Sequence, residues 1–146
     1  YTNIRIQSTA KEDAAAVFID NLQKNVPQTI TSFYNSIITG YLPNQLVVAT
    51  PFDRYYPGSF IGNYLQTDTL IMPHASNNAY RNASDTSSVF INTYYKYKEY
   101  HYYDFHLDSI SPAIGIGDRL IAEPYPNDRE GNSRSYVSPD AGCYQL

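Results

Sequence analysis

Residues 89–108 read Val-Phe-Ile-Asn-Thr-Tyr-Tyr-Lys-Tyr-Lys-Glu-Tyr-His-Tyr-Tyr-Asp-Phe-His-Leu-Asp, and this stretch is the strongest strand signal in the chain. Its odd positions are mostly apolar and its even positions mostly polar, as in a strand with one buried face. The alternation breaks at positions 98–100. We therefore expect two strands that meet there in an odd-length loop and place Lys96 close to Asp104. A single long, bent strand is the alternative, because no Gly, Asn or Pro marks a turn.

The same stretch is rich in tyrosine, in a chain that has 16 Tyr, 6 Phe and no Trp. A tyrosine side chain has an apolar ring and a polar tip, so it suits a half-buried sheet, a wet interface or a sugar-stacking surface. The alternation assigns Tyr95, Tyr97 and Tyr103 to the core face. It leaves Tyr94, Tyr100 and Tyr102 on the polar face. Together with Tyr55 and Tyr56 from the loop at 51–58, these three are the candidate surface binding residues.

Composition narrows the class of protein. The 146 residues fit one domain, and only 16% of them are charged, with a net charge of −4 and no basic cluster. This excludes a surface that tracks nucleic-acid phosphates. A neutral polar surface is typical of secreted, virion and filament proteins, so we expect an extracellular location or the surface of a cell or virion.

Three further sequence features concern disulfides, membrane contact and processing. The single cysteine, Cys143, excludes an intrachain disulfide. No apolar run approaches the roughly 18 residues of a membrane span, so membrane contact would require a segment absent from this chain. A start at Tyr1 rather than Met indicates a processed product or an excised domain.

The first 44 residues show helical patterns. A Thr9–Glu12 capping box and apolar residues at helical spacing predict a helix from about Lys11 to Asn25. A second helix is predicted from Pro27 to Gly40, where glycine suits a C-terminal cap. One long helix bent at Pro27 is the alternative.

The rest of the chain, 45–146, is predicted to be mainly antiparallel strands and loops. Strands are expected at 45–50, 59–66, 69–72, 114–122 and 142–146, with an exposed loop at 73–88 that contains a chance glycosylation sequon at Asn82. We find no internal repeat. The predicted fold is a single α+β domain, with an N-terminal helix or helix pair packed on an antiparallel β-sheet.

Asp104, His106 and Asp108 form the first candidate constellation. Alternate residues on a strand lie about 6.6 Å apart on one face, so these three side chains could converge on a metal ion. The alternative is a solvated outer face balanced by lysines. We favour this alternative and predict neither a metal nor another cofactor.

The second constellation begins at Ser109. The run Ser109-Ile110-Ser111-Pro112, followed by Gly117-Asp118 and an apolar segment, resembles the nucleophile box of signal-peptidase-like serine proteases. The resemblance implies a nucleophilic Ser109 and a lysine base downstream. No lysine follows Lys98, so we predict no catalytic residue. A triad of Cys143 or a serine with His74, His101 or His106 would be assembled in space and would leave no local signature.

Residues 10–56 resemble the soluble part of a type IV pilin, especially of the minor or type IVb kind. The matching parts are the predicted helix from Lys11, Ile30-Thr31 leading to Gly40-Tyr41-Leu42-Pro43, Pro51-Phe52 and Tyr55-Tyr56. The resemblance implies a helix, a loop and an antiparallel sheet. Bacterial pilins usually carry a paired cysteine near the C-terminus, and Cys143 is alone.

The sequence thus favours a non-enzymatic extracellular structural or adhesive subunit of a pilus (fimbrium), filament or virion. Its partners would be copies of itself or related subunits, or a host glycan or surface protein. One alternative is a carbohydrate-binding module that uses exposed tyrosines. Another is a serine hydrolase built from Asp104, His106 and Ser109.

Overall fold

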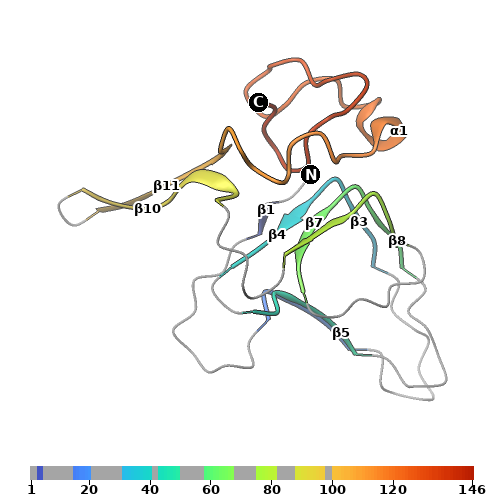
Figure 1. Ribbon diagram of the computed structural model, residues 1–146, viewed down its shortest axis with the longest axis horizontal. Helices are drawn as coiled ribbons and strands as arrows, with labels where there is room; N and C mark the ends of the chain where they lie inside the picture. Colours follow the sequence, from blue (N-terminus) through green and yellow to red (C-terminus); the bar gives the residue numbers. More distant parts are fainter. Residues whose placement is uncertain are drawn as a thin grey trace.

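A computed structural model of the chain describes residues 3–4, 15–20, 31–40, 43–49, 58–67, 75–81, 88–97 and 100–146 (Figure 1). The described residues are mostly β-structure, in small parallel and antiparallel sheets, with one short helix. The elements are β1 (Asn3–Ile4), β2 (Val17–Asp20), β3 (Phe33–Tyr34), β4 (Ile37–Ile38), β5 (Leu46–Ala49), β6 (Phe60–Ile61), β7 (Tyr64–Gln66), β8 (Ala75–Ser76), β9 (Ala79–Arg81), β10 (Phe90–Tyr97), β11 (Tyr100–Leu107) and α1 (Arg119–Ala122).

The strands from β1 to β9 pair in parallel and stack in a repeating order. Strand β2 pairs with β5, the strands β3, β6 and β8 form a second sheet, and β1, β4, β7 and β9 form a third. This order is that of a parallel β-solenoid, in which each coil of the chain lies on the previous one. In Figure 1 the β4 and β7 strands run side by side above β5, and the C-terminal part of the chain lies above them.

Each coil turns a corner of two residues between its paired short strands. The first corner residue has a positive φ at each of the three described corners: 45° at Asn35, 69° at Gly62 and 54° at Asn77. Asparagine and glycine tolerate this left-handed conformation better than other residues do. The expectation of no internal repeat was therefore wrong, because the corner recurs in each coil as Asn-Ser, Gly-Asn and Asn-Asn.

Asparagine side chains connect the three corners. Asn63 accepts a hydrogen bond from the Ser36 N–H (2.9 Å) and donates to the Phe33 carbonyl (2.8 Å). Asn78 repeats the arrangement one coil later, accepting from the Asn63 N–H (2.9 Å) and donating to the Phe60 carbonyl (2.7 Å). Because Asn63 is fully buried, these bonds satisfy backbone groups that water cannot reach.

Two hydrophobic clusters cover opposite faces of the β1-β4-β7-β9 sheet. Neighbouring residues on one strand contribute to different clusters, because side chains alternate along a strand. The first cluster lies inside the solenoid and comprises Ile19, Ile38, Leu46, Phe60 and Leu65. The second packs the outer face against the rest of the chain and comprises Ile37, Tyr64, Val89, Phe90, Leu107, Ala113 and Ala141.

Strands β10 and β11 form an antiparallel hairpin, which confirms the prediction of two strands in 89–108. The predicted register is wrong. Two residues separate the strands, so next to the turn odd positions pair with even ones: Tyr95 with Tyr102, and Lys96 with His101 rather than with Asp104. Farther from the turn the register shifts, and Asn92 lies opposite Asp104. The odd-even division of the tyrosines, which required odd positions to pair with odd ones, therefore does not apply.

The structure corrects the α+β fold class, since the described residues within the two predicted N-terminal helices form strands and not helices. Residues 17–20, inside the first predicted helix, form β2, and residues 33–34 and 37–38, inside the second, form β3 and β4. The apolar spacing at 33–38 comes from two short strands around a corner, with apolar side chains on both covered faces rather than on one helical stripe. Residues 9–14 and 21–30 of these predictions lie outside the described residues.

Predictions for the rest of the chain had mixed outcomes. The strand at 45–50 is confirmed as β5, and 59–66 forms β6 and β7 around the Gly62 corner. The loop predicted at 73–88 contains β8 and β9, and 114–122 is a turn followed by α1 rather than a strand. No strand forms at 142–146. Positions 69–72 and Asn82 lie outside the described residues.

Candidate functional site

The C-terminal segment, residues 108–146, is attached to the first corner of the solenoid through Asn35. The Asn35 side chain donates from Nδ2 to the Asp118 carbonyl (2.9 Å) and accepts at Oδ1 from the Asp118 N–H (2.6 Å). Gly62, at the next corner, leaves room for this pair. A Cβ at Gly62 would overlap Asn35 Oδ1 and would lie 2.5 Å from the Asp118 nitrogen.

Helix α1 begins directly after this attachment. The Asp118 carboxylate caps it by accepting from the Leu120 and Ile121 N–H groups at 2.9 and 3.2 Å. Arg119 is exposed, and its guanidinium carbon lies 4.5 Å from the centre of the Tyr136 ring. The Arg119 Nη2 also donates to the Tyr136 hydroxyl (3.3 Å), so the two side chains form a stacked pair at the surface.

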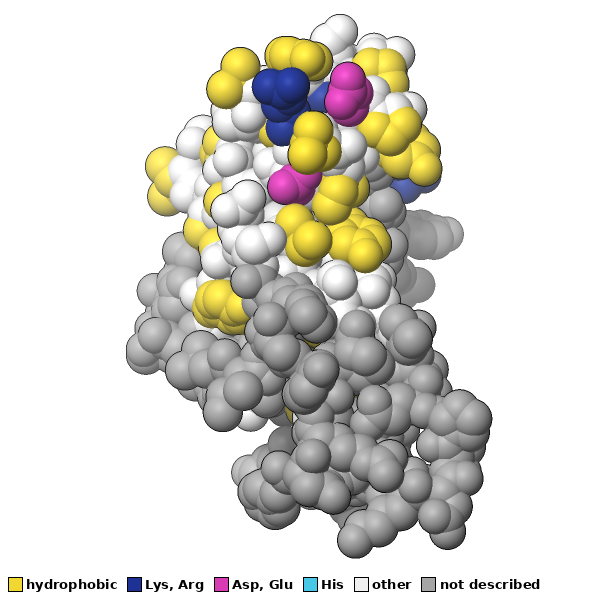
Figure 2. Space-filling view, turned by 90° about the vertical axis from the view of Figure 1, so that its right-hand side faces the viewer, with side chains coloured by type: hydrophobic (Ala, Val, Ile, Leu, Met, Phe, Trp, Pro, Cys, Tyr) yellow, Lys and Arg dark blue, Asp and Glu magenta, His cyan; other side chains and the backbone are white. Residues whose placement is uncertain are grey.

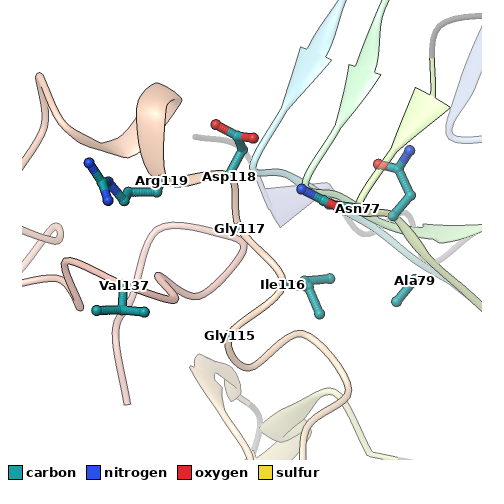
Figure 3. Close-up of a pocket in the computed structure, with 9 residues that line it drawn as sticks. Asn77, Ala79, Gly115, Ile116, Gly117, Asp118, Arg119 and Val137 are labelled. Atoms are coloured by element: carbon teal, nitrogen blue, oxygen red, sulfur yellow. The ribbon is translucent and has the colours of Figure 1, made fainter.

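A cleft of about 520 Å³ lies where the third corner faces the C-terminal segment (Figure 3). This volume falls in the range of about 300–1,000 Å³ that is usual for ligand pockets. We call it the junction cleft, and its lining residues are Asn77, Asn78, Ala79, Gly115, Ile116, Gly117, Asp118, Arg119 and Val137. Figure 3 shows Ile116 pointing towards Ala79, so an apolar floor joins the corner to the segment.

Asn77 has an unusual position in the junction cleft. It is exposed, and within the described part of the chain its side chain makes no hydrogen bond. The neighbouring Asn78 is committed to the corner, where its amide bonds with Asn63 and Phe60. Asn77 is therefore the lining residue with both a free donor and a free acceptor on a neutral side chain.

A second surface feature adjoins the cleft. Six large apolar side chains of the C-terminal segment are exposed, including Ile110 and Leu146 near its two ends. The other four lie within residues 120–137: Leu120 (70%), Tyr125 (59%), Tyr136 (64%) and Val137 (80%). We call these four residues the apolar patch. Figure 2 shows apolar side chains, with basic and acidic ones among them, on the described upper part of this face. Exposed apolar clusters with a polar rim commonly mark interaction sites.

His106, a predicted site residue, lies between two carboxylates. Its Nδ1 is 2.5 Å from Asp104 Oδ1, its Nε2 is 3.2 Å from Glu130 Oε2, and its ring stacks on Tyr144 with 4.0 Å between ring centres. The hydrogen bonds to Asp104 and Glu130 raise the pKa of His106 above its usual 6.5. Hydrogen bonds from the His106 backbone and ring lower the pKa of Asp104. The three groups link β11 to the C-terminal segment.

The structure does not bring Asp108 into this group. Its carboxylate accepts from the Ile110 N–H (3.2 Å) and from the Ser109 hydroxyl (3.4 Å), in an exposed turn. Glu130, which was not among the predicted site residues, lies beside His106 where Asp108 was expected. Within the described ranges, no group of three or more His, Cys, Asp or Glu side chains could hold a metal ion.

Ser109 has no base in the described part of the chain. Both imidazole nitrogens of His106 face carboxylates, and the Ser109 hydroxyl is directed to Asp108. The half-buried Cys143 is a poor nucleophile, because burial raises the pKa of its thiol and the reactive form is the thiolate. The described residues therefore do not bring Ser109, His106 and a carboxylate together as a triad.

The tyrosine candidates are only partly placed. The backbones of Tyr94, Tyr100 and Tyr102 belong to the β10-β11 hairpin, but their side chains lie outside what the structure describes. Tyr55 and Tyr56 lie outside the described residues altogether. Sequence reasoning missed Asn77 and Tyr136. The Asn-Ser, Gly-Asn and Asn-Asn dipeptides occur at the corners, but they do not indicate which corner is exposed.

Comparison with family models, curated proteins and solved structures found no match to this chain. Among the residues that the structure describes, no helix is both long enough and apolar enough to cross a membrane.

Proposed function

We propose that this chain is a non-enzymatic structural or adhesive subunit of an extracellular surface assembly, and that it binds its partner through the apolar patch. The observation that carries this proposal is the exposure of Leu120, Tyr125, Tyr136 and Val137, which range from 59% to 80% exposed. Large apolar side chains that are exposed on one segment contribute little to the stability of an isolated domain, but they contribute to binding when a partner covers them.

The composition of the patch suits a protein partner. Tyrosine and arginine are enriched at the energetic centres of protein interfaces, and Arg119 with Tyr136 already forms a stacked pair. Full burial of a side chain such as Leu120 contributes about 1.5–3 kcal/mol. The stacked pair adds rigidity, so fewer side-chain conformations are lost on binding.

The solenoid provides the support for this surface. Its corners hold the C-terminal segment through Asn35 and Asp118, and the second hydrophobic cluster fixes the segment to the outer face of the sheet. The proposal does not depend on the resemblance to pilins, because residues 17–20, which that resemblance placed in a helix, form strand β2.

Carbohydrate binding is the alternative that uses the same aromatic residues. A sugar stacks on a free ring face, and the Arg119 guanidinium already covers one face of Tyr136. The hydrolase alternative requires a base for Ser109, and the described residues provide none. Contact with a protein is therefore the better supported function.

The test measures self-association by sedimentation velocity over a range of concentrations. We expect the wild-type chain to form higher-order species, and the double variant Leu120→Ser, Tyr125→Ser to require at least about tenfold higher concentration, because two buried apolar side chains are lost. Ile91→Ser is the matched control. Ile91 is also exposed (59%) but lies on β10, away from α1 in Figure 1. A wild-type chain that remains a monomer, or a control that disperses equally, would contradict assembly through this patch.

A further inference from the structure

We propose that the junction cleft binds an extended polypeptide segment of the partner, and that the Asn77 amide pairs with the N–H and the C=O of one residue in that segment. This inference rests on the proposed function, since it names the part of the partner that the surface recognises. It concerns a side chain that is separate from the apolar side chains tested above.

The chain itself contains the precedent for this pairing, at Asn35. There one amide side chain donates to the carbonyl and accepts from the N–H of the same residue, Asp118. The Asp118 backbone is extended, with φ −76° and ψ 127°. An asparagine at a solenoid corner therefore already binds the backbone of an extended segment in this structure.

Asn77 occupies the same corner position two coils later. The register pairs Tyr34 with Ile61 and Ile61 with Ser76, so Asn35, Gly62 and Asn77 follow one another in a single column. Asn35 and Asn77 share the left-handed backbone, with φ of 45° and 54°. The two differ in what they face.

The C-terminal segment covers the first position of the column and leaves the third open. Asn35 is fully buried beneath Asp118, whereas Asn77 is exposed beside the junction cleft. Within the described residues the Asn77 amide bonds to no protein group. A backbone segment in the cleft would meet the donor-acceptor pair that Asn35 presents to Asp118.

The rest of the lining suits a peptide better than a sugar. Ala79, Ile116 and Val137 provide apolar contacts for side chains, and Gly115 and Gly117 add no side chains of their own to the lining. The described lining residues include no aromatic ring on which a sugar could stack. Among them are one carboxylate and one guanidinium, so this part of the lining has no charge preference that would select an anionic ligand.

The test uses N-acetylalanine N-methylamide, which presents the N–H and C=O of one residue as Asp118 does. The full chain is titrated and followed in ¹⁵N–¹H NMR spectra by the Asn77 side-chain amide and by the backbone amides of Gly115 and Gly117, which line the cleft. The two backbone amides report on binding in a variant that lacks the Asn77 side chain. We expect a saturable shift of the Asn77 side-chain resonances, with a Kd on the order of 10 mM for so small a probe. Asn77→Gly keeps the positive φ and removes the amide, and should weaken binding at least about tenfold.

Asn127→Ala is the matched control, because Asn127 is an exposed asparagine outside the cleft. It should leave the titration unchanged. The inference is overturned if the diamide produces no saturable shift at Asn77, if Asn77→Gly binds as well as the wild type, or if maltose shifts these resonances and the diamide does not. The apolar-patch variants report separately on the proposed function, since assembly through Leu120 and Tyr125 can persist when the Asn77 amide binds nothing.

Discussion

Asn35 and Asp118 lie 83 residues apart in the sequence, yet the side chain of the first pairs with both backbone polar groups of the second. The pair joins the first corner of the solenoid to the start of α1. Asn35 itself is fully buried, so its amide has no access to water in exchange for these two bonds. Together with the second hydrophobic cluster, this amide positions the C-terminal segment that carries the cleft and the apolar patch.

Replacing Asn35 tests this role. Asn35→Gly retains the left-handed corner but removes both bonds to Asp118, and should lower the free energy of unfolding by about 1–3 kcal/mol, since two part-buried backbone groups lose their partner. The measurement is urea denaturation followed by far-ultraviolet circular dichroism. Asn77→Gly is the control at the equivalent exposed corner and should change stability by less than about 0.5 kcal/mol. Equal effects at the two corners would disprove the role given to Asn35.

Gly62 should tolerate no side chain. Gly62→Ala places a Cβ against the Asn35 amide and the Asp118 nitrogen, at a φ of +69°, and should cost more than about 2 kcal/mol. Gly131→Ala separates strain from crowding, because Gly131 has a φ of +88° but no atom within 4 Å of the added Cβ. Gly131→Ala should lower the free energy of unfolding by only about 1 kcal/mol. Thermal or urea unfolding of both variants makes the comparison, and equal losses would show that crowding at Gly62 contributes nothing.

The link through His106 should weaken as the pH rises. The folded-state pKa of His106 lies above the ordinary 6.5, so its contribution to stability is complete below that value and is lost as the pH passes through the raised pKa. We expect the wild-type chain to lose stability from neutral to mildly alkaline pH, and His106→Gln to lose less. Glu130→Gln leaves Asp104 as the remaining carboxylate partner of the imidazole. The loss of stability of this variant with rising pH should lie between those of the wild type and His106→Gln. The measurement is the urea midpoint of unfolding across this pH range. Parallel plots of midpoint against pH for all three proteins would show that the His106 interactions contribute no pH-dependent stability.

Asp128 should contribute to the loss of stability in acid. Burial raises the pKa of this carboxyl, but hydrogen bonds from Gln145, Asn132 and Glu130 outweigh burial and lower it below the usual 3.8. Its contribution is therefore present above pH 3.8 and is lost as the pH falls through the lowered pKa.

The variant Asp128→Asn should lower stability at neutral pH by about 1.5–3 kcal/mol, the usual range for hydrogen bonds to a charged group, and should unfold with a shallower acid dependence. Asp108→Asn is the control and should change stability less than Asp128→Asn. Asp108 accepts hydrogen bonds from a backbone N–H at 3.2 Å and from a hydroxyl at 3.4 Å, in an exposed turn. Stability measured from pH 2 to 7 tests both variants. An Asp128→Asn variant as stable as the wild type would contradict the assignment.

Local patterns predicted some elements correctly. The apolar run around Leu46 formed a strand, and the alternation at 89–108 formed two strands, because both signals depend on neighbouring residues. The same reasoning failed at 33–38, where an apolar spacing typical of a helix arose from two strands with both faces covered. Single-sequence periodicity cannot separate one helical stripe from two buried sheet faces when the strands are only two residues long.

The candidate site was beyond sequence reasoning for a related reason. His106 was identified as a site residue, but its second carboxylate partner is Glu130 rather than Asp108, and this choice depends on how a loop folds over β11. Asn77 resembles any loop asparagine in the sequence. Its significance appears only when Asn35 is seen to occupy the equivalent corner and to hold Asp118.

By itself, the sequence determined the class of surface and the local turn chemistry. Low charge, abundant tyrosine, a lone cysteine, and asparagine or glycine where φ must be positive are all set by the side chains themselves. Tertiary structure alone decided that short strands stack in parallel, that Asn35 meets Asp118 and that Asn77 is left open. These outcomes depend on contacts between residues far apart in the chain, which form only when coils stack and bury both faces of the sheet.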